Sequence, residues 1–250
     1  MNAFAVRSPG SETNAARVSR FVYREQTRDT QRVIHQGSVV KFVTHGRHVI
    51  DIARRFGWQA GARYTDLRKV RHVASLGFLD IDWQKYDFRR HVEAADATRP
   101  FLTVARDITS IRSFDSVLRE AEILAKLATY VVIVPKAASL RAAIHEVPHE
   151  YLLGYSVPTR YGRTSIPISA FDRPVHLLGG RPDVQRRLAE RMPVVSIDCN
   201  RFTLDACFGD YFDGEIFRPH PRGGYIRCLT DSISNITALW SDYVPRIYIA

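Results

Sequence analysis

The sequence is poor in cysteine and has no long hydrophobic run. Its 250 residues include three cysteines, Cys199, Cys207 and Cys228, at spacings that match neither a disulfide framework nor a paired zinc motif. No apolar stretch approaches the roughly 20 residues that cross a bilayer, and residues 1–20 lack the apolar core of a signal peptide. We therefore expect a cytoplasmic protein with no metal site and no membrane anchor.

Acidic residues are fewer than basic ones. The chain holds 26 acidic and 36 basic residues, which gives a net charge of +10 and a pI near 9.8. Arginine supplies most of the positive charge, and its guanidinium group binds phosphate through two donors at once. The composition favours nucleic acid as the partner, and a basic protein without such a partner is the alternative.

Glycine-rich phosphate loops are absent as well. Neither a GxGxxG nor a GxxxxGK segment occurs, which argues against an open sheet that binds a dinucleotide or a nucleoside triphosphate. The chain instead has short apolar, strand-like runs that alternate with helical segments. The runs span residues 38–46, 70–81, 100–108, 129–136, 151–157, 174–180 and 193–199, and the helical segments span 83–97, 113–130, 138–146 and 182–191.

The apolar runs indicate a parallel sheet covered by helices, because they are apolar along nearly their whole length. Charged residues or glycines stand near the C-terminal ends of successive runs. They are Asp80, Asp107, Lys136, Gly154, Gly180 and Asp198. In a barrel, the C-terminal ends of all strands meet at one face, where active sites collect. We therefore predict an α/β fold, a (β/α)8 TIM-like barrel that is irregular or incomplete.

The remaining parts of the chain are assigned around this barrel. The eighth strand is expected near residues 225–229 or in the N-terminal region. Residues 1–37 are polar and rich in arginine, and they are predicted to form an N-terminal arm. A single barrel domain then spans residues 38–250, with an irregular C-terminal region over 209–250.

Three carboxylates at the ends of buried strands need a physical explanation, because burying a charge is costly unless it is paired or used. For each of Asp80, Asp107 and Asp198 alone, a helix cap or a salt bridge to arginine is sufficient. Three at one face of one barrel favour catalysis. A pair of carboxylates suits displacement at a sugar carbon, in which one attacks the anomeric carbon and the other handles the proton of the leaving group.

The segment VHLLGGRPDVQRRLAERMPVVSIDCNRF (175–202) resembles the tRNA-guanine transglycosylase superfamily, in which a similar strand, helix and strand end on an Asp-Cys pair. Weaker matches follow the family order upstream: GFLDIDW, VARDI, VVIVPK and LLGYSV. The short chain looks closest to the phage-type relatives that insert 7-deazaguanines into DNA. This resemblance covers residues 38–205 and implies the roles that follow.

By this resemblance, Asp198 is the nucleophile and Asp80 the general acid and base. The family's DSGGF segment is LDIDW here, so Asp82 is a rival for the second role, and strand alternation would place both side chains on the same face. Asp107 corresponds to the aspartate that reads the Watson–Crick edge of the purine. The family's glutamine is replaced by Pro135 with Lys136 beside it, and Lys136 is therefore a further residue expected at the base pocket.

Other residues are assigned with an alternative for each. Gly154, Gly179 and Gly180 would let the base approach the backbone closely, and ordinary turn geometry explains them equally well. Positive side chains near the site are candidates for phosphate contacts and are otherwise solvated charges. They are Arg160, Arg181 and Arg201. His176 is expected to be a packed core histidine.

The implied activity is exchange of guanine in DNA for a free 7-deazaguanine, 7-cyano-7-deazaguanine in the first instance. The partners are then DNA and the free base, and no cofactor is needed. The location would be the cytoplasm of the host cell if a phage encodes the chain. The alternatives are a tRNA substrate, a DNA N-glycosylase with the same two carboxylates, and a basic DNA-binding protein without catalysis.

Overall fold

The computed structural model describes residues 38–159 and 162–245, and residues 37–250 form one compact unit. The predicted N-terminal arm, residues 1–37, lies outside the described residues. None of the described helices has the length and apolar composition needed to span a bilayer.

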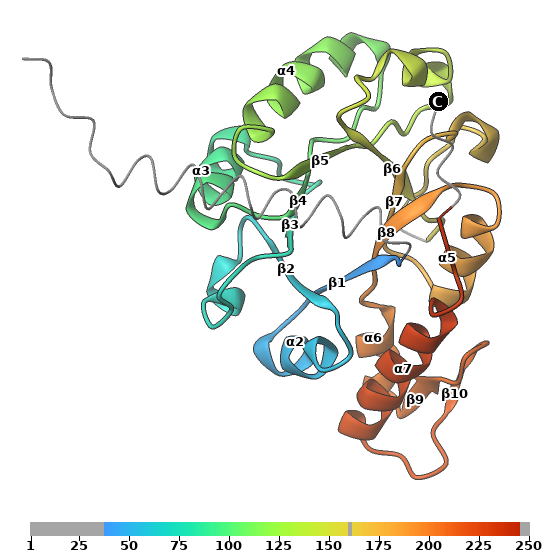
Figure 1. Ribbon diagram of the computed structural model, residues 1–250. Helices are drawn as coiled ribbons and strands as arrows, with labels where there is room; N and C mark the ends of the chain where they lie inside the picture. Colours follow the sequence, from blue (N-terminus) through green and yellow to red (C-terminus); the bar gives the residue numbers. More distant parts are fainter. Residues whose placement is uncertain (1–37, 160–161, 246–250) are drawn as a thin grey trace, which may run out of the picture. The chain divides into compact units, whose positions relative to one another are not determined.

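Eight parallel strands close into a barrel, so the predicted (β/α)8 architecture is confirmed. Figure 1 shows these strands around a common centre with helices outside them. The strands follow one another around the barrel in chain order, and β8 pairs with β1 to close it. They are β1 (Val40–Thr44), β2 (Gln59–Arg63), β3 (Phe78–Asp80), β4 (Leu102–Val104), β5 (Tyr130–Ile133), β6 (Leu152–Ser156), β7 (Val175–Leu178) and β8 (Val194–Asp198).

The helical layer outside the barrel is uneven. The α-helices of the described chain are α2 (Arg47–Arg54), α3 (Phe88–Thr98), α4 (Phe114–Leu124), α5 (Pro182–Ala189), α6 (Arg201–Cys207) and α7 (Tyr225–Leu239). Short 3-10 helices replace them in the links β2 to β3, β5 to β6 and β6 to β7. The predicted helix 138–146 is therefore two 3-10 turns, η3 (Ala138–Leu140) and η4 (Ala143–Glu146).

All seven predicted strand runs contain a barrel strand, but the prediction for the eighth is wrong. The missing strand is β2, whose sequence QAGAR carries no β-branched or aromatic residue. Its Gly61 packs against its neighbours: a Cβ there would lie 2.5 Å from Thr44 Oγ1 and 3.3 Å from Phe78. Residues 225–229 instead begin the helix α7.

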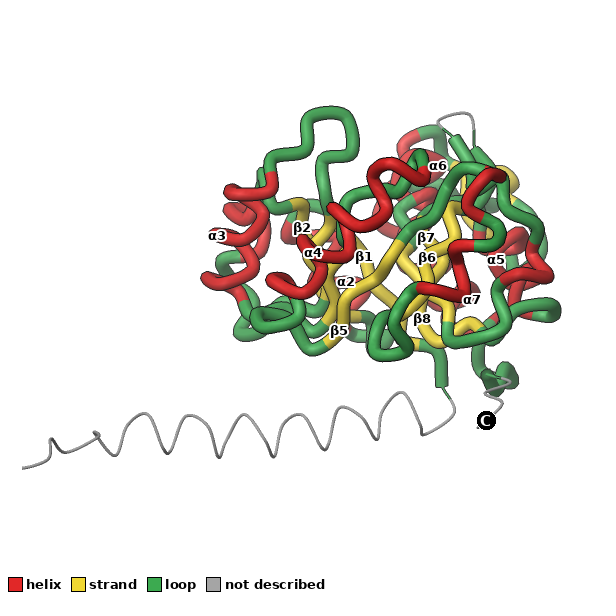
Figure 2. The backbone as a smooth tube through the Cα atoms, turned by 90° about the horizontal axis from the view of Figure 1, so that it is seen from above, coloured by secondary structure: helices red, strands yellow, loops and turns green. Residues whose placement is uncertain are grey.

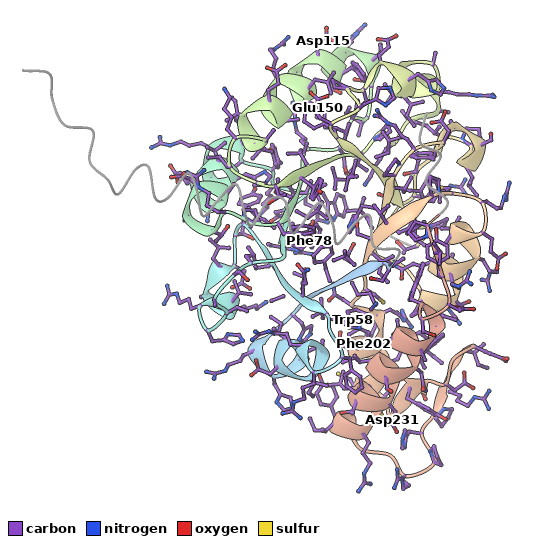
Figure 3. The ribbon with its side chains drawn as sticks, viewed as in Figure 1. Trp58, Phe78, Asp115, Glu150, Phe202 and Asp231 are labelled. Carbon is purple, nitrogen blue, oxygen red and sulfur yellow. The ribbon has the colours of Figure 1, made fainter. Side chains whose placement is uncertain are left out.

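The C-terminal region is also more regular than the sequence indicated. A two-stranded antiparallel hairpin, β9 (Asp210–Phe212) with β10 (Phe217–Pro219), precedes the 15-residue helix α7. Figure 1 shows α7 beside α6 and next to α2, which joins the first and last units of the barrel. The indole N–H of Trp58 donates to Thr237 Oγ1 of α7 at 2.9 Å, and Figure 3 shows Trp58 beside Phe202 of α6.

Two apolar cores lie on either side of the barrel wall. Outward-facing strand residues pack under the helices, while the centre of the barrel holds Phe42, Phe78 and His176. The ring centroids of Phe42 and Phe78 are 5.4 Å apart, and that of His176 lies 5.3 Å from Phe78. Figure 3 shows Phe78 near the middle of the barrel. This aromatic layer forms a floor beneath the C-terminal ends of the strands.

Candidate active site at the mouth of the barrel

The barrel mouth is the end at which the strands finish, and we define it by Asp80, Asp107, Gly179 and Asp198. Figure 2 shows the barrel from the side, with the strands running between its two ends. Asp80 and Asp198 are the last residues of β3 and β8. Parallel strands all point the same way, so the structure gathers residues that are far apart in the sequence at one end.

Asp198 is held by the loop that follows β7. Its side chain is only 11% exposed, and its Oδ1 accepts a hydrogen bond of 2.9 Å from the backbone N–H of Gly179. Below it, Gln185 of α5 donates through Nε2 to the carbonyl oxygens of Gly179 and of Asp198, both at 2.8 Å. The buried amide of Gln185 therefore ties the β7 loop to the end of β8.

The three glycines predicted to admit the base have different surroundings. A Cβ at Gly154 would lie 2.7 Å from Val132 and Val134, so close packing of the barrel interior accounts for that residue. Gly180 has φ +89°, and a Cβ there would lie 2.3 Å from Val157. Gly179 has φ +61° with open space around its Cβ position, which makes it the one of the three at which a ligand could approach the backbone.

His176 is completely buried, as expected of a core histidine, but it also contacts the site. Its Nδ1 lies 2.8 Å from Ser196 Oγ. Its Nε2 lies 3.5 Å from Asp198 Oδ1. In the part of the chain that the structure describes, this buried Nε2 has no hydrogen-bond partner.

Asp80 differs in charge state from an ordinary aspartate. Burial raises its pKa to about 7, and the negative charges of Asp198 and, more weakly, Asp107 act in the same direction. The N–H of Ile81 donates to Asp80 Oδ1 at 2.8 Å and Arg63 lies near enough to oppose the shift, but burial prevails. Asp80 thus exchanges its proton near neutral pH, which suits a general acid and base.

The structure separates Asp80 from Asp82, which sequence alternation could not do. The strand β3 ends at Asp80, so the alternation does not continue to Asp82. Asp82 lies in the following turn, where its Oδ1 accepts from the N–H of Gln84 at 3.3 Å. Asp82 therefore has a local structural role in the turn, and Asp80 is the better placed of the two.

Asp107 and Lys136 form an ion pair at the same mouth. They follow β4 and β5, and Lys136 Nζ lies 2.6 Å from Asp107 Oδ2. Burial raises the pKa of Asp107, and the Lys136 ammonium partly offsets that effect. Both side chains are largely buried. A ligand that binds Asp107 would therefore also meet the charge of Lys136.

The predicted phosphate-binding arginines are engaged with carboxylates. Arg181 Nε lies 2.9 Å from Asp183, and its guanidinium group lies over the ring of Phe217 at 5.8 Å. Arg201 binds both oxygens of Asp205, at 2.6 and 2.7 Å. Both arginines are close to half exposed. Arg160 lies outside the described residues.

Sequence reasoning did not find two residues that build this site, Gln185 and Asn200. Asn200 Oδ1 accepts from the backbone N–H of Thr44 at 2.9 Å, which joins the ends of β8 and β1. Gln185 lies in the charged segment PDVQRRLA, where nothing marks it except its place on the buried face with Leu188. Cys199, next to Asp198, is buried, and burial raises its thiol pKa to about 12. Cys199 is therefore a packed thiol that does not compete with Asp198.

The described residues contain no group of three or more His, Cys, Asp or Glu side chains arranged to hold a metal ion. A protein-family model matches residues 53–241 of the chain, and its description is a family of unknown function, DUF6610. The chain belongs to the DUF6610 family. The match begins before β2 and ends just after α7, so the DUF6610 region contains the three aspartates of the barrel mouth, Asp80, Asp107 and Asp198. No curated protein matches the chain.

Proposed function

We propose that this protein is a transglycosylase that exchanges guanine in DNA for a free 7-deazaguanine base, through a covalent intermediate on Asp198. The observation that carries the proposal is the pair of unlike carboxylates at the barrel mouth. Asp198 is fixed by the N–H of Gly179, and Asp80 holds its proton near neutral pH. A carboxylate fixed by a backbone donor, beside a carboxylic acid that keeps its proton near neutral pH, supplies the nucleophile and the acid for displacement at a glycosidic carbon.

In the proposed reaction, Asp198 first displaces guanine from C1′, and the incoming base then displaces Asp198. A guanosine turned out of the stack presents C1′ to Asp198. A carboxylate oxygen forms a bond to C1′ as the bond from C1′ to N9 breaks, and N9 takes the proton of Asp80. The free 7-deazaguanine then enters, Asp80 removes its N9 proton, and N9 displaces Asp198 from C1′. Two inversions retain the configuration at C1′.

The other residues of the mouth fit the recognition of a guanine-like base. The carboxylate of Asp107 accepts hydrogen bonds from N1–H and the exocyclic amine, a donor pair that guanine and its deaza analogues present and adenine lacks. The net charge of +10 favours a polyanionic substrate. The resemblance to the phage-type relatives favours DNA over tRNA.

The test is incorporation of labelled 7-cyano-7-deazaguanine into DNA, with tRNA offered in the same assay. We expect label to enter DNA with the wild-type protein and a protein–DNA adduct to be trapped. Asp198→Asn should abolish both while leaving DNA retention unchanged. Asp115→Asn is the matched control, because Asp115 lies on the outer helix α4 (Figure 3) and is exposed.

The other readings predict different results in that assay. Label in tRNA alone would identify a tRNA-guanine transglycosylase. Free guanine and abasic sites without label would identify an N-glycosylase, in which water is the acceptor. DNA retention without label, adduct or base release would identify a DNA-binding protein without catalysis and would refute the proposal.

A further inference from the structure

The buried histidine beneath Asp198 has a ring nitrogen, Nε2, that faces the proposed nucleophile. His176 is 0% exposed, and its Nε2 makes no hydrogen bond to any residue that the structure describes. Asp198 Oδ1, 3.5 Å away, is the acidic oxygen that Nε2 faces. A buried polar atom without a partner costs free energy, so this placement needs a reason.

The partner of the other ring nitrogen determines where the proton of His176 lies. Nδ1 lies 2.8 Å from Ser196 Oγ, and a hydroxyl group can donate to a bare ring nitrogen. A bare Nε2 would place its lone pair against the oxygen lone pairs of Asp198, which is repulsive. The consistent arrangement has Ser196 donating to Nδ1 and the ring proton on Nε2, directed at Asp198.

We propose that His176 is a positioning residue that, together with the N–H of Gly179, directs two donors at Oδ1 of Asp198 and leaves Oδ2 as the oxygen that attacks C1′. Among the described residues, Gly179 is the hydrogen-bond donor to this carboxylate, and it too binds Oδ1. Donors on one oxygen fix the carboxylate plane while the other oxygen keeps its lone pairs for the sugar. The reacting-atom part of this inference rests on the proposed function.

The surroundings of His176 leave it no other chemical role. Ser196 is 2% exposed, so a substrate cannot reach it and the Ser, His and Asp side chains do not form a hydrolytic triad. The rings of Phe42 and Phe78 pack against the imidazole. Asp80 lies two residues beyond Phe78 on β3, and the Asp107–Lys136 ion pair lies at the same mouth.

The first measurement does not depend on activity. Nitrogen NMR of histidine-labelled protein distinguishes a protonated from a bare ring nitrogen, and the His176 signals are assigned by their loss in His176→Gln. We expect the proton on Nε2 in the wild type and a shift of that signal in Asp198→Asn. A bare Nε2 would overturn the inference, whatever reaction the protein catalyses.

The second measurement is the single-turnover rate of adduct formation with DNA. His176→Leu removes the donor that faces Oδ1 at 3.5 Å, and we expect the rate to fall on the order of 10-fold, the lower end of the effect of losing an interaction with a charged group. His176→Gln retains a donor near the Nε2 position and should keep most of the rate. Equal rates in the Leu and Gln variants would overturn the positioning role.

The two failures are distinguishable. If wild-type protein forms no adduct with DNA or tRNA, the proposed function fails, and the NMR measurement still decides where the proton of His176 lies. If the adduct forms and Nε2 is bare, the function stands and the role of His176 is refuted.

Discussion

Two aspartates at one barrel mouth, Asp198 and Asp80, have different surroundings. Asp198 has a backbone donor at 2.9 Å, whereas Asp80 is partly buried near the negative charges of Asp198 and Asp107. The position of Asp80 thus raises its pKa well above that of an ordinary aspartate. This difference has consequences for rate and for stability.

The rate of adduct formation should depend on the protonation of Asp80. Because the pKa of Asp80 is raised to about 7, the acid form that protonates the leaving guanine is present below pH 7 and is lost above it. We expect the single-turnover rate to decline about tenfold per pH unit above about pH 7, as measured from pH 5 to 9. Asp80→Asn should remove most of the rate. A wild-type rate that is constant through pH 6–8 would contradict this assignment.

Asp80 should also lower stability at high pH. The folded protein binds the Asp80 proton more tightly than the unfolded chain does, so its stability falls as pH rises from the ordinary aspartate pKa through about 7. Asp80→Asn does not titrate, and we expect its stability advantage over wild type to grow by about 2 kcal/mol between pH 5 and pH 8. Urea unfolding at the two pH values measures this. An advantage that does not change with pH would be inconsistent with a raised pKa.

At the scale of elements, the site depends on how β7, α5 and β8 are joined. The link is Gln185 of α5. It donates to the carbonyl oxygen of Gly179, just after β7, and to that of Asp198, at the end of β8. Its own Oε1 is buried without a hydrogen-bond partner among the described residues, so the two donated bonds outweigh an unsatisfied acceptor.

Replacing Gln185 with Met keeps its volume and removes its donors. Two buried carbonyl oxygens would lose their partner, and we expect a loss of about 2 to 4 kcal/mol in the free energy of unfolding. Gln84→Met is the matched control, since Gln84 is exposed in the turn after β3 and should cost less than about 0.5 kcal/mol. Equal losses in the two variants would show that the amide of Gln185 is dispensable.

The adjacent glycines of the β7 loop give a second matched pair. Gly180→Ala adds a Cβ 2.3 Å from Val157 at φ +89°, and we expect a cost of about 3 kcal/mol or more from overpacking and backbone strain. Gly179→Ala adds a Cβ into open space at φ +61°, and the left-handed conformation alone should cost about 1 kcal/mol. Thermal unfolding of both variants measures the difference, and the reverse order would contradict the packing described for this loop.

The sequence predicted strands with strong apolar runs and missed those elements whose stability comes from packing. In the run 193–199, Asp198 follows four buried residues, 194–197. This apolar run was sufficient to predict the strand. The strand β2 is missed because Gly61 is fitted to its neighbours and has no strand propensity of its own. The helix α7 begins YIRCL, which reads as a strand. Its buried Leu229, Ile233 and Ile236 nevertheless follow helical spacing and would have identified it.

In the candidate site, too, residues at the ends of apolar runs could be predicted, whereas positions set by packing could not. The carboxylates could be found because each stands at the end of an apolar run, and the roles proposed for them come from the resemblance in segment order. The positions of Gln185 and His176 relative to Asp198 could not be found, because they depend on how three elements pack. Likewise, only the end of β3 at Asp80 separates Asp80 from Asp82.

At the scale of the whole molecule, α7 joins the first and last parts of the barrel. It packs against α6 and α2, and Trp58, which precedes β2, reaches it through the hydrogen bond to Thr237. Contacts of this kind bring together residues about 180 positions apart in the chain.

Trp58→Phe tests the joint between α7 and the barrel. The change keeps an aromatic ring against Phe202 but removes the indole donor to Thr237, and we expect a loss of about 1 to 2 kcal/mol in the free energy of unfolding. Trp83→Phe is the control, because Trp83 is 52% exposed and should change stability by less than about 0.5 kcal/mol. If the two variants lose the same stability, α7 does not depend on this bond.

The pairing of β8 with β1 also bears on how the protein is made. Asp198 takes its place only when the last barrel strand to leave the ribosome joins the first, and Asn200 then binds Thr44 across that junction. A chain whose synthesis stops before this point carries Asp80 but not the proposed nucleophile. If the proposed function holds, the site is therefore completed only when the last barrel strand has been made.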